Sequence, residues 1–203
     1  MTAILERVAR PVDQDRKFYY LTLAQYQLMI EHDILTEKDK VELILGQIIE
    51  KVPITSEHSA TVSKIRRYFQ DNFSQEYEIR SENPVALPND SQPEPDCVMA
   101  LFKEDYYVNQ HPTPPEILLV IEVAKSTLYT DRYLKATTYA GAGIKEYWIV
   151  NLVDRQLEVH LRPNVEQGTY ASVNQYAPEE AFESPFAGAV TVSDLLPPLP
   201  DAD

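Results

Sequence analysis

The sequence predicts an α/β fold (α+β in composition), with one mixed central sheet flanked by helices. Two observations predict it. Residues 56–151 alternate in the order helix, strand, strand, strand, helix, strand, and helices before and after the strands of a sheet favour a layered architecture. No segment looks like a linker, so we expect a single domain over 21–203, with its core at about 56–162. Residues 1–20 look like a loosely attached lead-in.

A helix and a hairpin are expected before the core. LTLAQYQLMIEHDIL, residues 21–35, has apolar residues at helical spacing and Thr22 as a candidate cap, and should end near His32. KVELILGQIIEKV reads as two short strands broken at Gly46, where a hairpin or a bulge is expected.

The core elements follow from side-chain periodicity. A helix capped by Ser56 and a second helix ended by glycines at 141–143 carry apolar stripes. Short apolar or β-branched runs predict the strands. The expected helices are 56–73 and 128–140, and the expected strands are 77–87, 96–101, 116–124, 145–151 and 156–162.

Two segments connect or extend this core. FKEDYYVNQHPTPP, residues 102–115, is polar and ends in prolines, so we expect a surface loop that could act as a lid. Residues 164–203 read as a hairpin, a last strand and a helical turn. This β-rich C-terminal extension could cover the edge of the sheet or form a subunit contact.

Composition limits the function. The formal net charge of −14 argues against a protein that coats nucleic acid through a broad basic face. No apolar run approaches the roughly 18 residues of a membrane span, and the charged N-terminus does not resemble a signal peptide, so we expect a cytoplasmic protein with no membrane partner. The single cysteine, Cys97, excludes an internal disulfide and a cysteine-based zinc site.

A carboxylate stands in the most apolar predicted strand. In ILLVIEVAKST, residues 117–127, Glu122 needs a partner or a chemical task, because an unpaired buried charge costs several kcal/mol. The preceding strand begins with PEPD, which places Asp96 at the edge of the sheet. Two carboxylates on adjacent strands make a hard-oxygen site suited to Mg²⁺ or Mn²⁺, with Asp96 and Glu122 as its metal ligands.

An ordered series of motifs resembles a known family. VELILGQII, SEH at a helix start, PEPD, IEVAKST and DRYLKATTYAGAGIKEYWIVN resemble the Uma family of restriction endonuclease domains, within the PD-(D/E)XK nuclease superfamily. The resemblance covers roughly residues 20–160. It implies a restriction-endonuclease-like αβββαβ core, a divalent-metal site and phosphodiester hydrolysis. It also assigns Asp96 and Glu122 to the two acidic positions of the motif.

The lysine of the motif is out of place. In the superfamily pattern it follows the acid by two positions, where this chain has Ala124. Lys125 would point to the opposite face if the strand continued. Lys135 lies about 10 Å along the next helix from Leu128, at ~1.5 Å per residue, so its arm could reach the carboxylates. We favour Lys135 over Lys125 as the catalytic lysine.

Two residues at the start of the first core helix complete the candidate site. The resemblance implies that Glu57 is an additional metal ligand or a base for water, and His58 could orient a group or shuttle protons beside it. Each has a purely structural alternative. Glu57 is favourable at a helix N-terminus for the macrodipole alone, and His58 could be an ordinary half-buried histidine.

Other polar and aromatic residues have structural interpretations. We expect Glu42 to pair with a lysine across the hairpin, and Asp131 with Lys135 could form a simple i, i+4 surface ion pair. Tyr139, Tyr147 and Trp148 are expected to pack in the core.

The leading functional hypothesis is a metal-dependent nuclease acting on nucleic acid, DNA more than RNA, as a homodimer. Ala124 and the net charge of −14 favour an alternative, a catalytically weak protein that keeps the fold as a binding or assembly module. A third hypothesis is hydrolysis of a smaller phosphate ester, which needs no DNA track.

Overall fold

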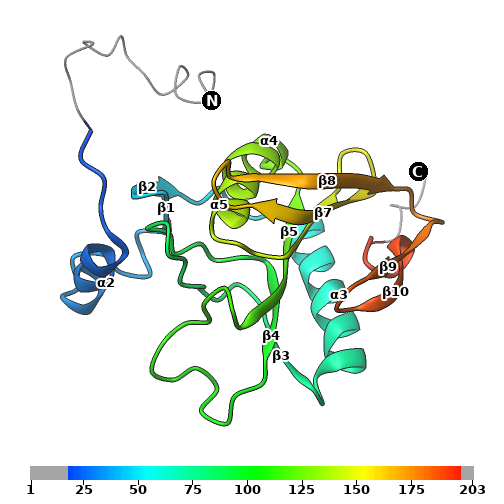
Figure 1. The fold of residues 1–203 in the computed structure, drawn as a ribbon, viewed down its shortest axis with the longest axis horizontal. Coiled ribbons are helices and arrows are strands. Elements are labelled where there is room, and N and C mark those ends of the chain that lie inside the picture. The colour runs from blue at the N-terminus through cyan, green and yellow to red at the C-terminus, as the bar shows by residue number, and fades with distance from the viewer. Residues whose placement is uncertain (1–17, 198–203) are drawn as a thin grey trace.

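The computed structural model describes residues 18–197, and a six-stranded mixed sheet forms its centre (Figure 1). The strand order is β3-β4-β5-β6-β7-β8. All neighbours are antiparallel except β5 and β6, which run parallel. The strands are β3 (Tyr77–Arg80), β4 (Cys97–Leu101), β5 (Ile117–Ala124), β6 (Glu146–Asn151), β7 (Gln156–Asn164) and β8 (Thr169–Tyr176). The predicted mixed sheet and its helix-strand order are confirmed.

Helix α3 (Ser56–Phe73) covers one face of the sheet. Its side chains Ile65 and Phe69 are fully buried against Ile121 of β5 and Trp148 of β6, and the Phe69 and Trp148 rings lie 5.9 Å apart. Because side chains alternate along β5, Leu119, Ile121 and Val123 face this helix.

The opposite face carries the crossover that joins β5 to β6. It consists of one α-helical turn, α4 (Leu128–Thr130), a π-helical turn (Asp131–Lys135) and α5 (Ala136–Gly141). Tyr139 of α5 is fully buried and lies in the same core as Val120. Glu122 alternates with Val120, so it points toward the crossover.

The π-helical turn corrects the expectation of one regular helix over 128–140. A π-helix hydrogen-bonds each residue to the fifth one along, which changes how far successive side chains rotate about the axis. Side chains in and around this turn therefore do not follow the 3.6-residue spacing assumed from the sequence.

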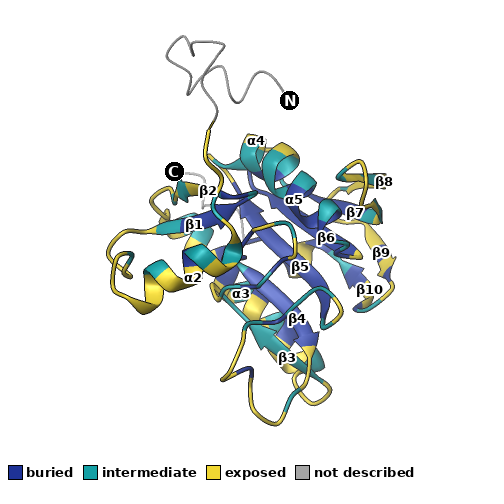
Figure 2. Ribbon diagram, turned by 60° about the vertical axis from the view of Figure 1, so that its left-hand side comes forward, coloured by how far each residue is buried: buried dark blue, intermediate teal, exposed yellow. Residues whose placement is uncertain are grey.

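The N-terminal helix and hairpin are present as predicted. Helix α2 (Leu23–Glu31) begins after Thr22, whose side chain accepts from the backbone of Gln25 in a capping box. Strands β1 (Val41–Ile44) and β2 (Gln47–Glu50) pair as a hairpin. Most of α2 is exposed, whereas the central strands are buried (Figure 2).

Two element boundaries differ from the sequence prediction. The side chain of Thr55, not that of Ser56, caps α3 by accepting from His58 N–H. The strand expected over 77–87 ends at Arg80. The segment beyond it includes Pro84, which cannot donate a ladder hydrogen bond.

The C-terminal extension adds a strand to one edge of the sheet and packs a hairpin against the core. Strand β8 lengthens the sheet beyond β7, and a hairpin of β9 (Ala181–Ser184) and β10 (Gly188–Thr191) packs Phe182 and Val190 into the core that α3 shares. A short 3₁₀ turn, Val192–Asp194, follows. The lead-in predicted at 1–20 falls mostly outside the described residues.

The loop at 102–115 is anchored to the body of the protein. Tyr107 is buried, and its hydroxyl donates to the backbone oxygen of Leu101 at 2.7 Å. The cationic groups of Arg80 and Lys103 lie over its ring, at 5.5 and 4.7 Å from the centroid. These contacts hold the loop near Tyr107 in place.

Within residues 18–197, none of the helices is long and apolar enough to cross a membrane.

Candidate active site

A pocket of about 150 Å³ opens where β5 ends and α4 begins, beside the start of α3 and the end of the β1–β2 hairpin. Seven carboxylates and three lysines line it, so its charge favours cations over phosphate groups. These residues are Glu42, Glu50, Glu82, Glu94, Asp96, Glu122, Asp131, Lys51, Lys125 and Lys135.

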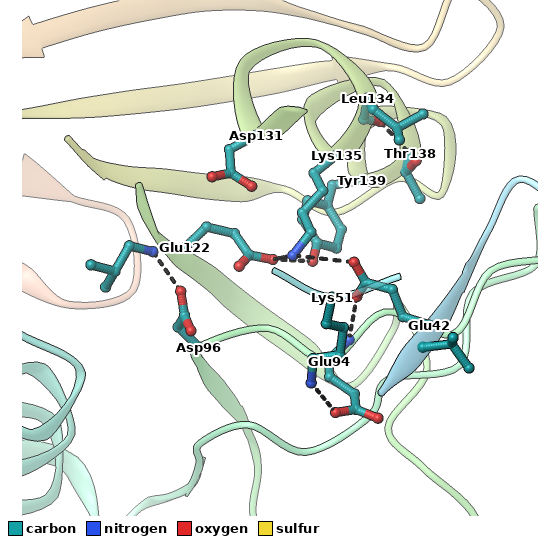
Figure 3. Close-up of polar contacts among 12 residues, drawn as sticks. Glu42, Lys51, Glu94, Asp96, Glu122, Asp131, Leu134, Lys135, Thr138 and Tyr139 are labelled. Atoms are coloured by element: carbon teal, nitrogen blue, oxygen red, sulfur yellow. Dashed lines mark hydrogen bonds and ion pairs between the residues drawn. The ribbon is translucent and has the colours of Figure 1, made fainter. Parts of the chain in front are cut away.

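Glu122 is the most deeply set of the predicted ligands. It is 3% exposed, and its Oε1 accepts hydrogen bonds from Lys135 Nζ at 2.9 Å and from the Tyr139 hydroxyl at 2.6 Å (Figure 3). Burial raises the pKa of Glu122 to about 8, although the Lys135 charge acts to lower it. A further cation in the pocket would therefore stabilise the charged form of this carboxylate.

Lys135 reaches Glu122 from the crossover, whereas Lys125 does not. The Lys135 Nζ also lies 3.7 Å from Glu42 Oε1, so one ammonium stands between two carboxylates. Burial lowers the pKa of Lys135, but Glu122 and Glu42 outweigh it and hold that pKa well above its usual value. The Lys125 ammonium pairs instead with Glu57 Oε2 at 2.5 Å.

Asp96 stands beside Glu122 at the start of β4. Its Oδ2 accepts from the backbone N–H of Val123 at 2.7 Å and lies 3.2 Å from His58 Nε2. Burial lowers the pKa of His58, but the hydrogen bond and charge of Asp96 outweigh burial and raise it. The structure thus brings His58 to the site as a partner of Asp96.

Glu57 takes a position at the rim. It lies in the first turn of α3 and pairs with Lys125, and it is not among the described residues that line the pocket. This position matches the structural alternative, a carboxylate at a helix N-terminus.

Three residues of the site were not recognised from the sequence. The expected partner of Glu42, a lysine across the hairpin, is wrong, because its Oε1 faces Lys135 and its Oε2 accepts from Glu94 N–H at 3.1 Å. Tyr139 is buried as predicted, but its hydroxyl also binds Glu122. The one available signal was its spacing of four residues from Lys135, which places the two side chains on one helix stripe.

Asp131 is the third of these residues. The surface ion pair with Lys135 is wrong, because Asp131 is only 2% exposed and forms no ion pair within 4 Å among residues 18–197. Burial raises the pKa of Asp131 to about 6, against the lowering effects of Lys135 and the Thr127 hydroxyl.

The two predicted ligands have oxygens to offer a cation. Within residues 18–197, Asp96 Oδ1 and Glu122 Oε2 accept no hydrogen bond. No three His, Cys, Asp or Glu side chains of that range are arranged to hold one metal ion. The donor set fits Mg²⁺, which is often bound through one or two carboxylates and keeps several waters.

Comparison with known proteins identifies the family. Residues 23–193 match the family Uma2, described as "Putative restriction endonuclease". The chain belongs to the Uma2 family. No curated protein matches it. A crystal structure from Anabaena variabilis ATCC 29413, described as "a putative nuclease belonging to DUF820", is similar in fold to this Uma2 protein. The two are 17% identical, with a TM-score of 0.65 over 86% of this chain and 97% of that one.

Proposed function

We propose that this Uma2 protein is a divalent-metal-dependent nuclease that hydrolyses phosphodiester bonds in nucleic acid. One observation carries the proposal. The Lys135 ammonium lies 2.9 Å from Glu122 in a pocket that also contains Asp96, so two acids and a lysine meet although the strand itself lacks the lysine. Family membership supports a nuclease, and the geometry supports the site.

Asp96 and Glu122 would hold the cation, which we propose to be Mg²⁺ or Mn²⁺. When bound, the cation supplies positive charge against the phosphate and acidifies a water. The pocket needs this charge, because its carboxylates outnumber its lysines and would otherwise repel the phosphate.

Lys135 would act as a fixed positive charge. An ammonium has three donors, and the carboxylates of Glu122 and Glu42 take up two directions at most. The remaining N–H can donate to an oxygen of the phosphate as negative charge develops there. Tyr139 positions Glu122 by fixing its Oε1, which leaves Oε2 for the cation.

The substrate and assembly are further parts of the proposal. We propose DNA as the main substrate and a homodimer as the active form, since cleavage of both strands of a duplex is served by two symmetric sites. Light scattering of the protein with and without a DNA duplex measures the assembly. A monomer under both conditions contradicts the dimer. It does not contradict cleavage of one strand, which the nicking assay measures separately.

Metal titration and plasmid nicking test the function. Mn²⁺ or Mg²⁺ should raise the melting temperature of the wild type, and should not do so in Asp96→Ala or Glu122→Gln, because each loses a ligand. Both variants should lose nicking activity. Glu104→Gln, which removes one exposed carboxylate outside the pocket, is the matched control and should behave as wild type.

An inactive binding module is the alternative, favoured by the acidic lining of the pocket and by the net charge of −14. It predicts metal-independent binding of a partner and no cleavage. Nicking that depends on metal and disappears in Glu122→Gln excludes it, whereas a wild type inactive with every divalent metal excludes the nuclease.

A further inference from the structure

Asp131 is a buried carboxylate that lines the pocket. The proposed function gives it no role so far. Asp131 opens the π-helical turn that ends at Lys135, and both residues line the pocket. Its carboxylate is drawn on the side of Glu122 that faces away from Asp96, with no interaction marked to it (Figure 3).

One oxygen of Asp131 has no fixed partner. The neighbouring hydroxyl of Thr127 carries a single proton, so it can donate to only one of the two oxygens. No ammonium or guanidinium of residues 18–197 lies within 4 Å of the carboxylate. A charged group that is 2% exposed and lines a pocket needs a ligand there, and water or a cation would satisfy it.

Three other candidate bases of the site each have a partner or a charge that limits them. A protonated Lys135 has no lone pair with which to accept a proton. His58 Nε2 lies 3.2 Å from Asp96, and its Nδ1 is buried without a hydrogen-bond partner among the described residues. Glu57 is paired with Lys125 outside the pocket lining. A group that orients the water and takes its proton typically speeds such a step by about 10²–10⁴-fold.

We propose that Asp131 is the catalytic residue that holds the attacking water and accepts its proton. This inference rests on the proposed nuclease function. The water oxygen forms a bond to phosphorus, the bond from phosphorus to the leaving sugar oxygen breaks, and the electron pair of that bond stays on the leaving oxygen. One water proton passes to the Asp131 carboxylate, and the leaving oxygen takes a proton from solvent.

The local backbone supports this assignment. Single π-helical turns are rare and occur often at functional sites. Here the turn brings Asp131 and Lys135, which the sequence places four residues apart, to one pocket without pairing them. Lys135 pairs with Glu122 and Glu42 instead, which leaves the Asp131 carboxylate without a cation among residues 18–197.

Asp131→Asn tests the assignment, because the amide keeps the shape and cannot accept the proton. We expect plasmid nicking at saturating Mn²⁺ to fall about 100-fold or more, the range typical of a lost general base. The Mn²⁺ affinity, measured by electron paramagnetic resonance without substrate, should change less than about threefold, since Asp131 is not a ligand. Asp71→Asn on the exposed side of α3 is the matched control.

The outcomes separate this inference from the proposed function. If Asp131→Asn loses cleavage but keeps its Mn²⁺ affinity and melting temperature, the result supports the role of Asp131. An Asp131→Asn protein that cleaves within threefold of an active wild type, or that loses Mn²⁺ binding, overturns the role of Asp131 alone. A wild type without cleavage overturns the function and this role together. If Asp131→Asn does not fold, Asp131→Glu decides, and cleavage at the wild-type rate by that displaced carboxylate counts against the assignment.

Discussion

Replacing Lys135 by methionine should strongly destabilise the folded protein. The Lys135 side chain is 12% exposed and lies between Glu122 and Glu42, so its removal leaves two buried carboxylates without a cation. Breaking a buried ion pair in this way costs about 3–5 kcal/mol. For a protein of this size, that corresponds to a fall in melting temperature of about 6–20 °C.

The loss should depend on pH with a definite sign. The pKa of Glu122, about 8, lies above its usual value of 4.5, so the folded state binds the proton more tightly than the unfolded chain. This contribution to stability is fully present below pH 4.5 and is lost as the pH rises through 8. Because Lys135 lowers that pKa, its removal should cost more at pH 8 than at pH 5.

Thermal denaturation at pH 5 and pH 8 measures both effects. Lys145→Met, at an exposed position, is the control and should change the melting temperature by less than about 2 °C. The double variant Lys135→Met with Glu122→Gln should recover at least about 1 kcal/mol relative to the single variant, since one of the unpaired charges is gone. A Lys135→Met protein as stable as the control at pH 8 would refute the reasoning.

Three further predictions concern other buried polar groups. Tyr139→Phe should lower the free energy of unfolding by about 1–3 kcal/mol in urea denaturation, because Glu122 loses its 2.6 Å hydrogen bond; an unchanged value contradicts the role of the hydroxyl. Burial lowers the pKa of His160 to about 4, below its usual value of 6.5. The free energy of unfolding should therefore fall by up to about 3 kcal/mol as the pH drops from above 6.5 to 4. His160→Phe should remove this acid dependence when unfolding is measured over a pH series. Arg132→Met should cost about 3–5 kcal/mol, because Glu158 is 2% exposed and bonded to that guanidinium; an effect under 1 kcal/mol would place the support of Glu158 elsewhere.

Much of the fold could be predicted because the sheet is regular. The apolar runs of β4, β5 and β6 are short, separated by clear breaks and buried along almost their whole length. Their order with the helices indicated the architecture. Cap identity was harder, since Thr55 and Ser56 are adjacent and either side chain can serve at the N-terminus of a helix.

The residues of the candidate site were easier to pick out from the sequence when they lie on strands than when they lie on the crossover. Asp96 and Glu122 stand out because carboxylates in apolar strands need an explanation. Asp131 was misjudged because it is buried rather than at the surface, and because Lys135 pairs with Glu122 and Glu42 instead. The partner of Glu42 was out of reach for another reason, since it comes from a helix more than 90 residues away in the chain.

Ala124 shows why the lysine can come from the helix. The residue is 0% exposed and belongs to the same core as Ala136 and Tyr139, so a lysine there would have to fit its methylene chain into space that is already filled. Small residues on both sides let the crossover settle on the strand, and that approach is what brings its lysine within reach. A pattern search that requires acid and lysine two positions apart would therefore pass over this chain, although the charges it looks for stand together in space.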